Sequence, residues 1–248
     1  MSVDPVRRLQ TLGHDITNLP VSKIPSSIDK CCFICVNAFE SYRRNLGTGP
    51  INDAVSFAKT VKAFDYEIYV LQNPHKRNFL LYFEKIIASS ERHCVFYYVG
   101  QMNQNLAKTK PETSFVFDDG TVPETDFLDR VIGLKKESTK LTLVTDTCPP
   151  GSIFDIKNGQ LFGKVLPPLV LSIATVPDLQ ALKKIKHNTL DDQGIFTYHL
   201  TKNIKAMPEM TVEQLSESLR KVLREYGDLI VVGASSPNLL KESLFEVE

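Results

Sequence analysis

The chain has 248 residues, of which 42% are hydrophobic and 23% are charged, the balance of an ordinary soluble globular protein. Its 29 basic and 29 acidic residues cancel, so no overall field favours nucleic acid or an anionic membrane surface, and we expect neither partner. Residues 1–15 contain no apolar segment of signal-peptide length, and the longest apolar stretch, residues 165–176, is too short to cross a bilayer, so we expect a soluble, cytoplasmic protein.

Strand-like and helix-like segments alternate along most of the chain. Apolar, β-branched runs predict six strands, at residues 30–36, 66–71, 93–100, 140–147, 169–174 and 229–232. Helical spacing predicts helices at residues 51–64, 76–89, 124–134, 194–206 and 211–226. Asn52 is the expected cap of the first helix, and Thr211 and Gln214 have capping-box spacing at the last. Strands separated by helices imply right-handed crossovers and a mostly parallel, six-stranded α/β sheet flanked by helices.

Two segments depart from this alternation. Residues 113–122 contain Asp118-Asp119-Gly120, a turn sequence between two short β segments. A looser stretch at residues 149–168 separates the fourth and fifth strands. The length suits one large α/β domain. We expect a short N-terminal leader over residues 1–29 and a single domain over residues 30–248.

Four of the five cysteines lie inside predicted strands: Cys31, Cys32, Cys35 and Cys94. An odd number of cysteines clustered in apolar runs does not resemble a disulfide framework. Because a strand points alternate residues to opposite faces, the first three would not converge on one zinc ion. We expect these four thiols to be buried and to pack as small hydrophobic groups.

Two apolar runs lead to side chains that could take part in a reaction. Residues 141–148 end on Cys148, and residues 95–102 pass through Gln101. The carboxyl ends of parallel strands are where ligands and chemistry sit in an open α/β sheet. Cys148 is therefore a candidate nucleophile. The residue beside it should be its base, and Gln101 cannot take a proton.

Four strings in chain order resemble the caspase-like cysteine peptidases, and metacaspases more than caspases. They are Asn37 after the first strand, residues 46–54 (similar to Leu-x-Gly-Cys-x-Asn-Asp-Ala), residues 146–151 (similar to Asp-x-Cys-x-Ser-Gly) and residues 194–200 (similar to Gly-x-Phe-Thr). The resemblance covers about residues 30–245. It implies a caspase-like three-layer α/β/α sandwich, with a large-subunit-like part at about 30–158 and a small-subunit-like part at about 165–248.

The resemblance also implies roles for individual residues. Cys148 matches the nucleophile, and Asp53 and Asp146 match acids that line a pocket for Arg or Lys. Pro50 and Val99 stand at two further pocket positions, where the family has Cys and Ser. The backbone amides of Met102 and Cys148 would form the oxyanion pocket. Both acids also have structural explanations, Asp53 as an acid in the first turn of a helix and Asp146 as a cap at a strand end.

The chain departs from the family where the catalytic histidine is expected. The family string Tyr-Ser-Gly-His-Gly here reads Tyr98-Val99-Gly100-Gln101-Met102, and Pro150 replaces the serine after the nucleophile. A cysteine with pKa ~8.5 is mostly unionised at neutral pH, and a glutamine amide cannot carry its proton. We therefore expect a catalytically impaired pseudopeptidase with a regulatory or binding role. Its partner would be a peptide or protein, such as an active metacaspase.

Two other functions remain open. One is an active endopeptidase that cleaves after Arg or Lys with another base, for which His75, after the second strand, is the first candidate. The other is a cysteine-based phosphatase or sulfurtransferase. A phosphatase loop needs Arg six positions after the cysteine, where Phe154 stands, and Pro149 and Pro150 remove two amides that would hold the anion.

A metal requirement is also left open by the sequence. Many metacaspases need calcium, and acids follow the predicted hairpin at Asp118, Asp119, Asp126 and Asp129. Calcium needs several converging oxygens, and a turn followed by a helix start explains these acids equally well. We expect no cofactor and assign no metal ligand.

Overall fold

The computed structural model describes residues 4–39, 46–105, 112–148, 154, 156–161, 163–177 and 193–247. Its α-helices are α1 (Pro5–Leu12), α2 (Gly49–Lys62), α3 (Lys76–Ser89), α4 (Glu124–Leu134), α5 (Ile195–Ala206) and α6 (Val212–Leu223). Its strands are β1 (His14–Asp15), β2 (Ile28–Val36), β3 (Glu67–Gln72), β4 (Ser90–Asn105), β5 (Glu112–Phe117), β6 (Gly120–Pro123), β7 (Lys140–Cys148), β8 (Gln160–Leu161), β9 (Lys164–Val165), β10 (Val170–Pro177) and β11 (Asp228–Ala234). Short 3₁₀ helices lie at Val21–Lys23, Arg224–Tyr226 and Pro237–Lys241.

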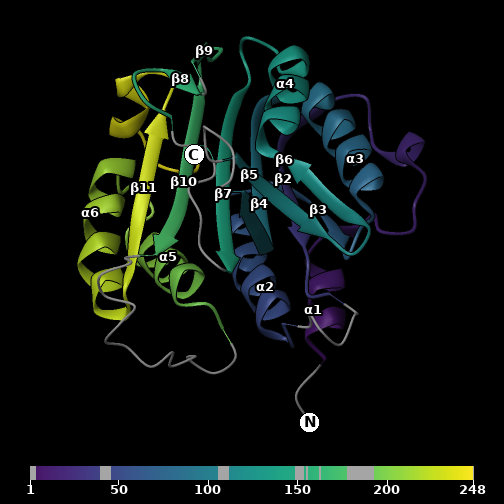
Figure 1. Cartoon of the computed structure of the whole chain (residues 1–248), viewed down its shortest axis with the longest axis horizontal. Coiled ribbons are helices and arrows are strands. Elements are labelled where there is room, and N and C mark those ends of the chain that lie inside the picture. Colours follow the sequence, from purple (N-terminus) through teal and green to yellow (C-terminus); the bar gives the residue numbers. More distant parts are fainter. Residues whose placement is uncertain are drawn as a thin grey trace.

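The central sheet has the strand order β1-β3-β2-β4-β7-β10-β11. Every neighbouring pair is parallel except β10 and β11, whose arrows point in opposite directions in Figure 1. The six predicted strands all lie in this sheet, and the predicted α/β fold class is confirmed. Three further strands extend it: β1 at one edge, and β5 and β6 in a hairpin that pairs with the end of β4.

Apolar side chains cover both faces of the sheet. Alternate residues of one strand enter different cores: Phe33 of β2 packs with α3 and α4, whereas Ile34 packs with α2, α5 and α6. On β4, Phe96 and Tyr97 divide in the same way. Because both faces are covered by helices, the strands read as continuous apolar runs rather than as an alternating pattern.

The strand cysteines follow this division. Cys31, Cys35 and Cys94 lie in the first core and Cys32 in the second, all completely buried with free thiols. Burial raises the pKa of Cys32 and Cys35 well above the usual range, because a thiolate is poorly solvated in an apolar core. The prediction that these thiols act as buried hydrophobic groups is confirmed.

One of the two predicted helix N-caps agrees with the structure. The capping box of α6 is confirmed, since Thr211 Oγ1 accepts from the Gln214 amide and Gln214 Oε1 accepts from the Thr211 amide. The prediction of Asn52 as a cap is wrong, because α2 begins earlier, after Thr48. Pro50 occupies the first turn, where its fixed φ favours the helix and its missing N–H costs no hydrogen bond.

The segment before β2 packs onto the sheet. Helix α1 lies against α2 with Leu9 fully buried, and β1 pairs in parallel with β3. Ile16 and Ile24 enter the first core. In the part of the chain that the structure describes, no helix combines the length and apolarity that a membrane span requires.

Phe154 and Ile156, in the connection between β7 and β10, are buried in the core. The Phe154 amide donates to the Glu124 carboxylate, and its carbonyl accepts from Ser172 Oγ at 2.8 Å. Its ring lies 5.3 Å from that of Phe127. Ile156 approaches β11 so closely that a β-carbon on Gly233 would lie 2.7 Å from Ile156 Cβ. Phe154, at the position where a phosphatase loop needs Arg, is therefore a core residue.

Candidate functional site at the carboxyl edge of the sheet

The ends of β4 and β7 run side by side at the carboxyl edge of the parallel sheet (Figure 1). The register pairs Val99 with Asp146 and Gln101 with Cys148. The backbones of the candidate nucleophile and of the residue in the family's histidine position therefore occupy the same rung. This adjacency follows from the strand order, in which β4 and β7 are neighbours.

A buried polar cluster fixes the backbone where β4 leaves the parallel sheet. The Tyr98 hydroxyl donates to the Gln101 carbonyl at 2.9 Å. Asn37 Nδ2 donates to the Val116 carbonyl of β5 at 2.9 Å. A β-carbon on Gly100 would lie 2.8 Å from Asn37 Cβ, so only glycine fits between these groups without displacement. Burial also raises the Tyr98 pKa, so its hydroxyl stays a donor.

Two carboxylates converge close to this edge. Asp53 of α2 is 4% exposed, and its Oδ1 accepts from the Gly194 amide at 2.8 Å. Asp146 Oδ2 accepts from Thr197 Oγ1 at 2.6 Å and from the Thr197 amide at 3.3 Å. A β-carbon on Gly194 would lie 2.7 Å from Asp53 Oδ2 and 3.0 Å from Asp146 Oδ2. The acids that the resemblance predicts at one pocket therefore meet at the N-terminus of α5.

Burial and mutual repulsion determine the protonation of this pair. Burial, followed by the charge of Asp146, raises the pKa of Asp53 well above its usual range, against a lowering effect of the Gly194 amide. Burial also raises the pKa of Asp146, while the Thr197 hydrogen bonds act in the opposite direction. Two poorly solvated carboxylates that both lie against Gly194 favour a state in which one is protonated.

Tyr97 connects the pair to the second core. Thr197 Oγ1 uses its single proton on Asp146, so the Tyr97 hydroxyl, 2.6 Å away, donates to Thr197 Oγ1. Phe57 stacks on Tyr97 with ring centroids 4.1 Å apart. Burial and the two carboxylates raise the Tyr97 pKa well above its usual range. Gly194, Thr197 and Tyr97 were not among the predicted site residues, and the one sequence indication was the Gly-x-Phe-Thr resemblance.

The remaining predicted site residues line the same region or its border. Pro50 is buried in the first turn of α2, one turn before Asp53. Val99 is 4% exposed and pairs with Asp146 across the ladder. Met102 is 4% exposed and lies where β4 begins to pair with β5 opposite Phe115.

His75, the first alternative base, lies at the start of α3 beyond the end of β3. Its side chain is 73% exposed, and its Nδ1 lies 3.6 Å from Asp119 Oδ2. Strands β2 and β4 separate β3 from β7, so three strand spacings, roughly 14 Å, lie between the ends of β3 and β7.

The other described histidines occupy different parts of the fold. His93 is completely buried at the amino end of β4. His199 lies on α5 with its ring against those of Tyr198 and Tyr226. His14 lies in β1, and His187 falls outside the described residues. Among the described histidines, none is on the carboxyl ends of β4 and β7.

Two of the acids considered for calcium, Asp119 and Asp129, have separate partners. Asp119 accepts from the Lys76 amide at 2.9 Å and so caps α3, and Asp129 pairs with Lys164. Asp126 lies in the first turn of α4. Within the described ranges, no group of three or more His, Cys, Asp or Glu side chains is arranged to hold a metal. These donors do not fit calcium, which takes six to eight oxygens.

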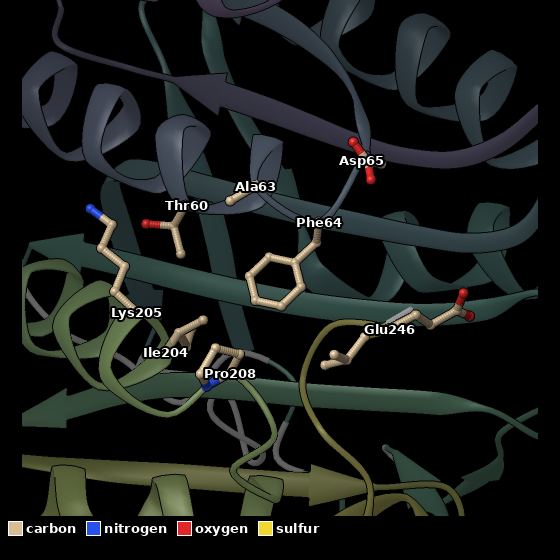
Figure 2. A pocket seen from close by; sticks show the side chains of 9 residues that line it. Thr60, Ala63, Phe64, Asp65, Ile204, Lys205, Pro208 and Glu246 are labelled. Carbon is tan, nitrogen blue, oxygen red and sulfur yellow. The ribbon is translucent and has the colours of Figure 1, made fainter.

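A separate groove of about 410 Å³ lies at the opposite edge of the sheet. Figure 2 shows Thr60 of α2 and Ala63, which follows that helix, on one side of the Phe64 ring, with Ile204 and Pro208 on the other. Phe64 precedes β3, and Ile204 is near the end of α5. The groove is therefore remote from the acid pair, which lies at the start of α5.

Comparisons with known proteins agree with this architecture. No curated protein matches the chain. Among solved structures, the chain is similar to the protein GSU0716 from Geobacter sulfurreducens, with a TM-score of 0.61 and 12% identity over 88% of this chain and 99% of that one. At that identity the likeness concerns the fold alone. The family model described as the caspase domain matches residues 28–245. The chain therefore belongs to the caspase domain family.

Proposed function

We propose that this protein is a caspase-like pseudopeptidase that binds a peptide or protein and regulates rather than cleaves it. The observation that carries the proposal is the pairing of Gln101 with Cys148 across β4 and β7. The family fold and the cysteine are retained, while Gln101, its partner on the neighbouring strand, has no group that titrates near neutral pH.

The chemistry of the reaction explains why this exchange matters. The thiolate is the attacking species, and an unperturbed cysteine is only a few per cent ionised at neutral pH. A histidine would accept the thiol proton and later deliver it to the leaving amine. Gln101 can donate a hydrogen bond, but it can neither accept the thiol proton nor deliver a proton to the leaving amine. Loss of one member of such a unit lowers turnover on the order of 10⁴–10⁶-fold in comparable hydrolases.

The acid pair supports recognition of a basic side chain. Asp53 and Asp146 present carboxylate oxygens to one point, and a guanidinium can be bound by such oxygens in a bidentate manner. The partner is thus a protein or peptide that offers Arg or Lys, and an active metacaspase is a partner of this kind. Val99, the ladder partner of Asp146, and Pro50, in the first turn of α2, are both buried.

Turnover of fluorogenic peptides ending in Arg or Lys tests the proposal. We expect the wild-type protein and Cys148→Ala to release fluorophore at the same background rate. Both should bind an uncleavable arginine peptide with equal affinity, and Asp146→Asn should bind it more weakly. Asp129→Asn, an exposed acid on α4, is the matched control. Cleavage at ordinary peptidase rates that Cys148→Ala abolishes would contradict the proposal, and His75→Ala would then be the first variant for locating the base.

A further inference from the structure

The N-terminus of α5 closes over the acid pair. Three donors of this helix start reach the two carboxylates: the Gly194 amide on Asp53, and the Thr197 amide and hydroxyl on Asp146. The bond from Gly194 to Asp53 joins residues 141 positions apart. The pair is therefore a junction between α2, β7 and α5, and its charge bears directly on whether α5 stays docked.

The charge of the pair is limited by its surroundings. Asp53 is 4% exposed, and both Oδ2 atoms approach Gly194. From β4, Tyr97 is the titratable group that faces the pair, and it is neutral and donates to Thr197. From α5 the facing groups are Gly194 and Thr197, which carry no charge. The positive end of the α5 dipole stabilises about half a negative charge, which is less than the two charges of a fully ionised pair.

We propose that Asp53 and Asp146 hold one proton between them while α5 is docked, and that a cationic side chain takes the place of this proton when it binds. The proton passes to solvent, both carboxylates are then ionised, and the ammonium or guanidinium supplies the positive charge that the proton supplied before. Binding of one basic side chain thus releases one proton. The second step rests on the proposed function, whereas the shared proton in the free protein does not.

The shared proton is tested on the free protein by infrared spectroscopy at neutral pH. We expect the carbonyl stretch of one protonated carboxylic acid in the wild-type protein and its loss in Asp53→Asn. The band should persist in Asp129→Asn, where the acid is exposed and paired with Lys164. If Asp53→Asn does not fold, Asp146→Asn serves as the second variant. Absence of the band from the folded wild-type protein overturns the inference.

Proton release is tested by calorimetry with an acetylated peptide amide ending in arginine. The heat of binding is compared in phosphate and Tris, whose ionisation enthalpies differ. We expect close to one proton released per peptide bound, and none for a peptide with uncharged citrulline in place of arginine. Binding without proton release overturns the inference and leaves the proposed function standing. No binding of the arginine peptide contradicts the proposed function, and the infrared result then decides the shared proton by itself.

Discussion

Gln101 of β4 and Cys148 of β7 are direct partners in a parallel ladder at the carboxyl edge of the sheet. The chain belongs to the caspase domain family, and the carboxyl edge of a parallel sheet is where ligands and chemistry sit in an open α/β fold. The pairing permits a test of the proposed function, in which a histidine is placed at position 101. The other described cysteines help, because Cys31, Cys32, Cys35 and Cys94 are completely buried, so alkylation of the folded protein reports on Cys148.

Gln101→His should accelerate alkylation of Cys148 by iodoacetamide at neutral pH roughly tenfold, because a neighbouring imidazole raises the thiolate fraction from a few per cent to tens of per cent. The rate is followed by mass spectrometry of the intact protein. Gln101→Asn is the matched control and should react like the wild type. Equal rates for Gln101→His and Gln101→Asn would show that position 101 does not influence the thiol.

Asp53→Asn should stabilise the protein at neutral pH. Folding raises the pKa of Asp53, so its contribution to stability is greatest below its unfolded pKa of about 3.9 and is lost as pH rises towards the folded pKa. The asparagine variant removes this loss, which is about 1.4 kcal/mol for each unit of pKa shift. Urea unfolding across the acidic to neutral range measures it. The difference between the two proteins should shrink on acidification, and a pH-independent difference would contradict the prediction.

His93 should make the protein acid-sensitive in the mildly acidic range. Tyr66 Oη accepts from the Glu246 amide and lies 2.5 Å from His93 Nδ1, and His93 Nε2 lies 2.9 Å from Thr142 Oγ1. Burial, followed by the charges of Lys140, Lys30 and Arg92, lowers the His93 pKa well below its usual range. Unlike the unfolded chain, the folded protein therefore resists protonation at this site.

The sign of the effect follows from this depressed pKa. Stability from His93 is complete above the unfolded pKa of about 6.5 and decreases below it by about 1.4 kcal/mol per pH unit until the folded pKa is reached. His93→Gln should lower stability at neutral pH but flatten the profile between about pH 6.5 and 5. Chemical denaturation at closely spaced pH values measures both curves, and parallel curves would contradict the assignment to His93.

Gly233→Ala should destabilise the fold by roughly 1–3 kcal/mol, because overpacking a filled core displaces its neighbours. The added β-carbon would lie 2.8 Å from the Ile156 carbonyl and 3.0 Å from its amide, and neither backbone atom can rotate away. Gly133→Ala in α4 is the control, since its β-carbon meets nothing within 4 Å; there the better helix propensity of alanine should leave stability unchanged or higher. Thermal unfolding of both variants decides, and equal melting temperatures would contradict the prediction.

Helix bounds were predictable where the pattern is local. The predicted limits of α3 and α4 agree with the structure because apolar spacing alone sets them. The continuation of β4 beyond residue 100 was missed, since its partner there is β5, which is brought back by the hairpin. Helix α1 and strand β1 were missed for a similar reason: β1 has two residues, and α1 is stabilised by packing against α2.

The candidate site divides in the same way. Strand order and resemblance predicted that positions 101 and 148 are neighbours and that Asp53 and Asp146 belong together. The hydrogen bonds that the acid pair accepts come from Gly194 and Thr197, and Thr197 lies 51 residues from Asp146 in the sequence. Such contacts depend on where α5 docks, which no local pattern encodes.

Phe154 and Ile156 lie in the connection between β7 and β10, and their burial affects whether the two fragments stay together after this connection is cleaved. Val165, in the short β8–β9 hairpin, is 74% exposed, and a trypsin-like protease would cleave after Lys164 beside it. Because β7 and β10 stay neighbours in the sheet, the two fragments would remain associated after such a nick. The cleaved protein would therefore give two bands on a denaturing gel but a single species under native conditions. Two bands alone would not show that cleavage had activated the protein.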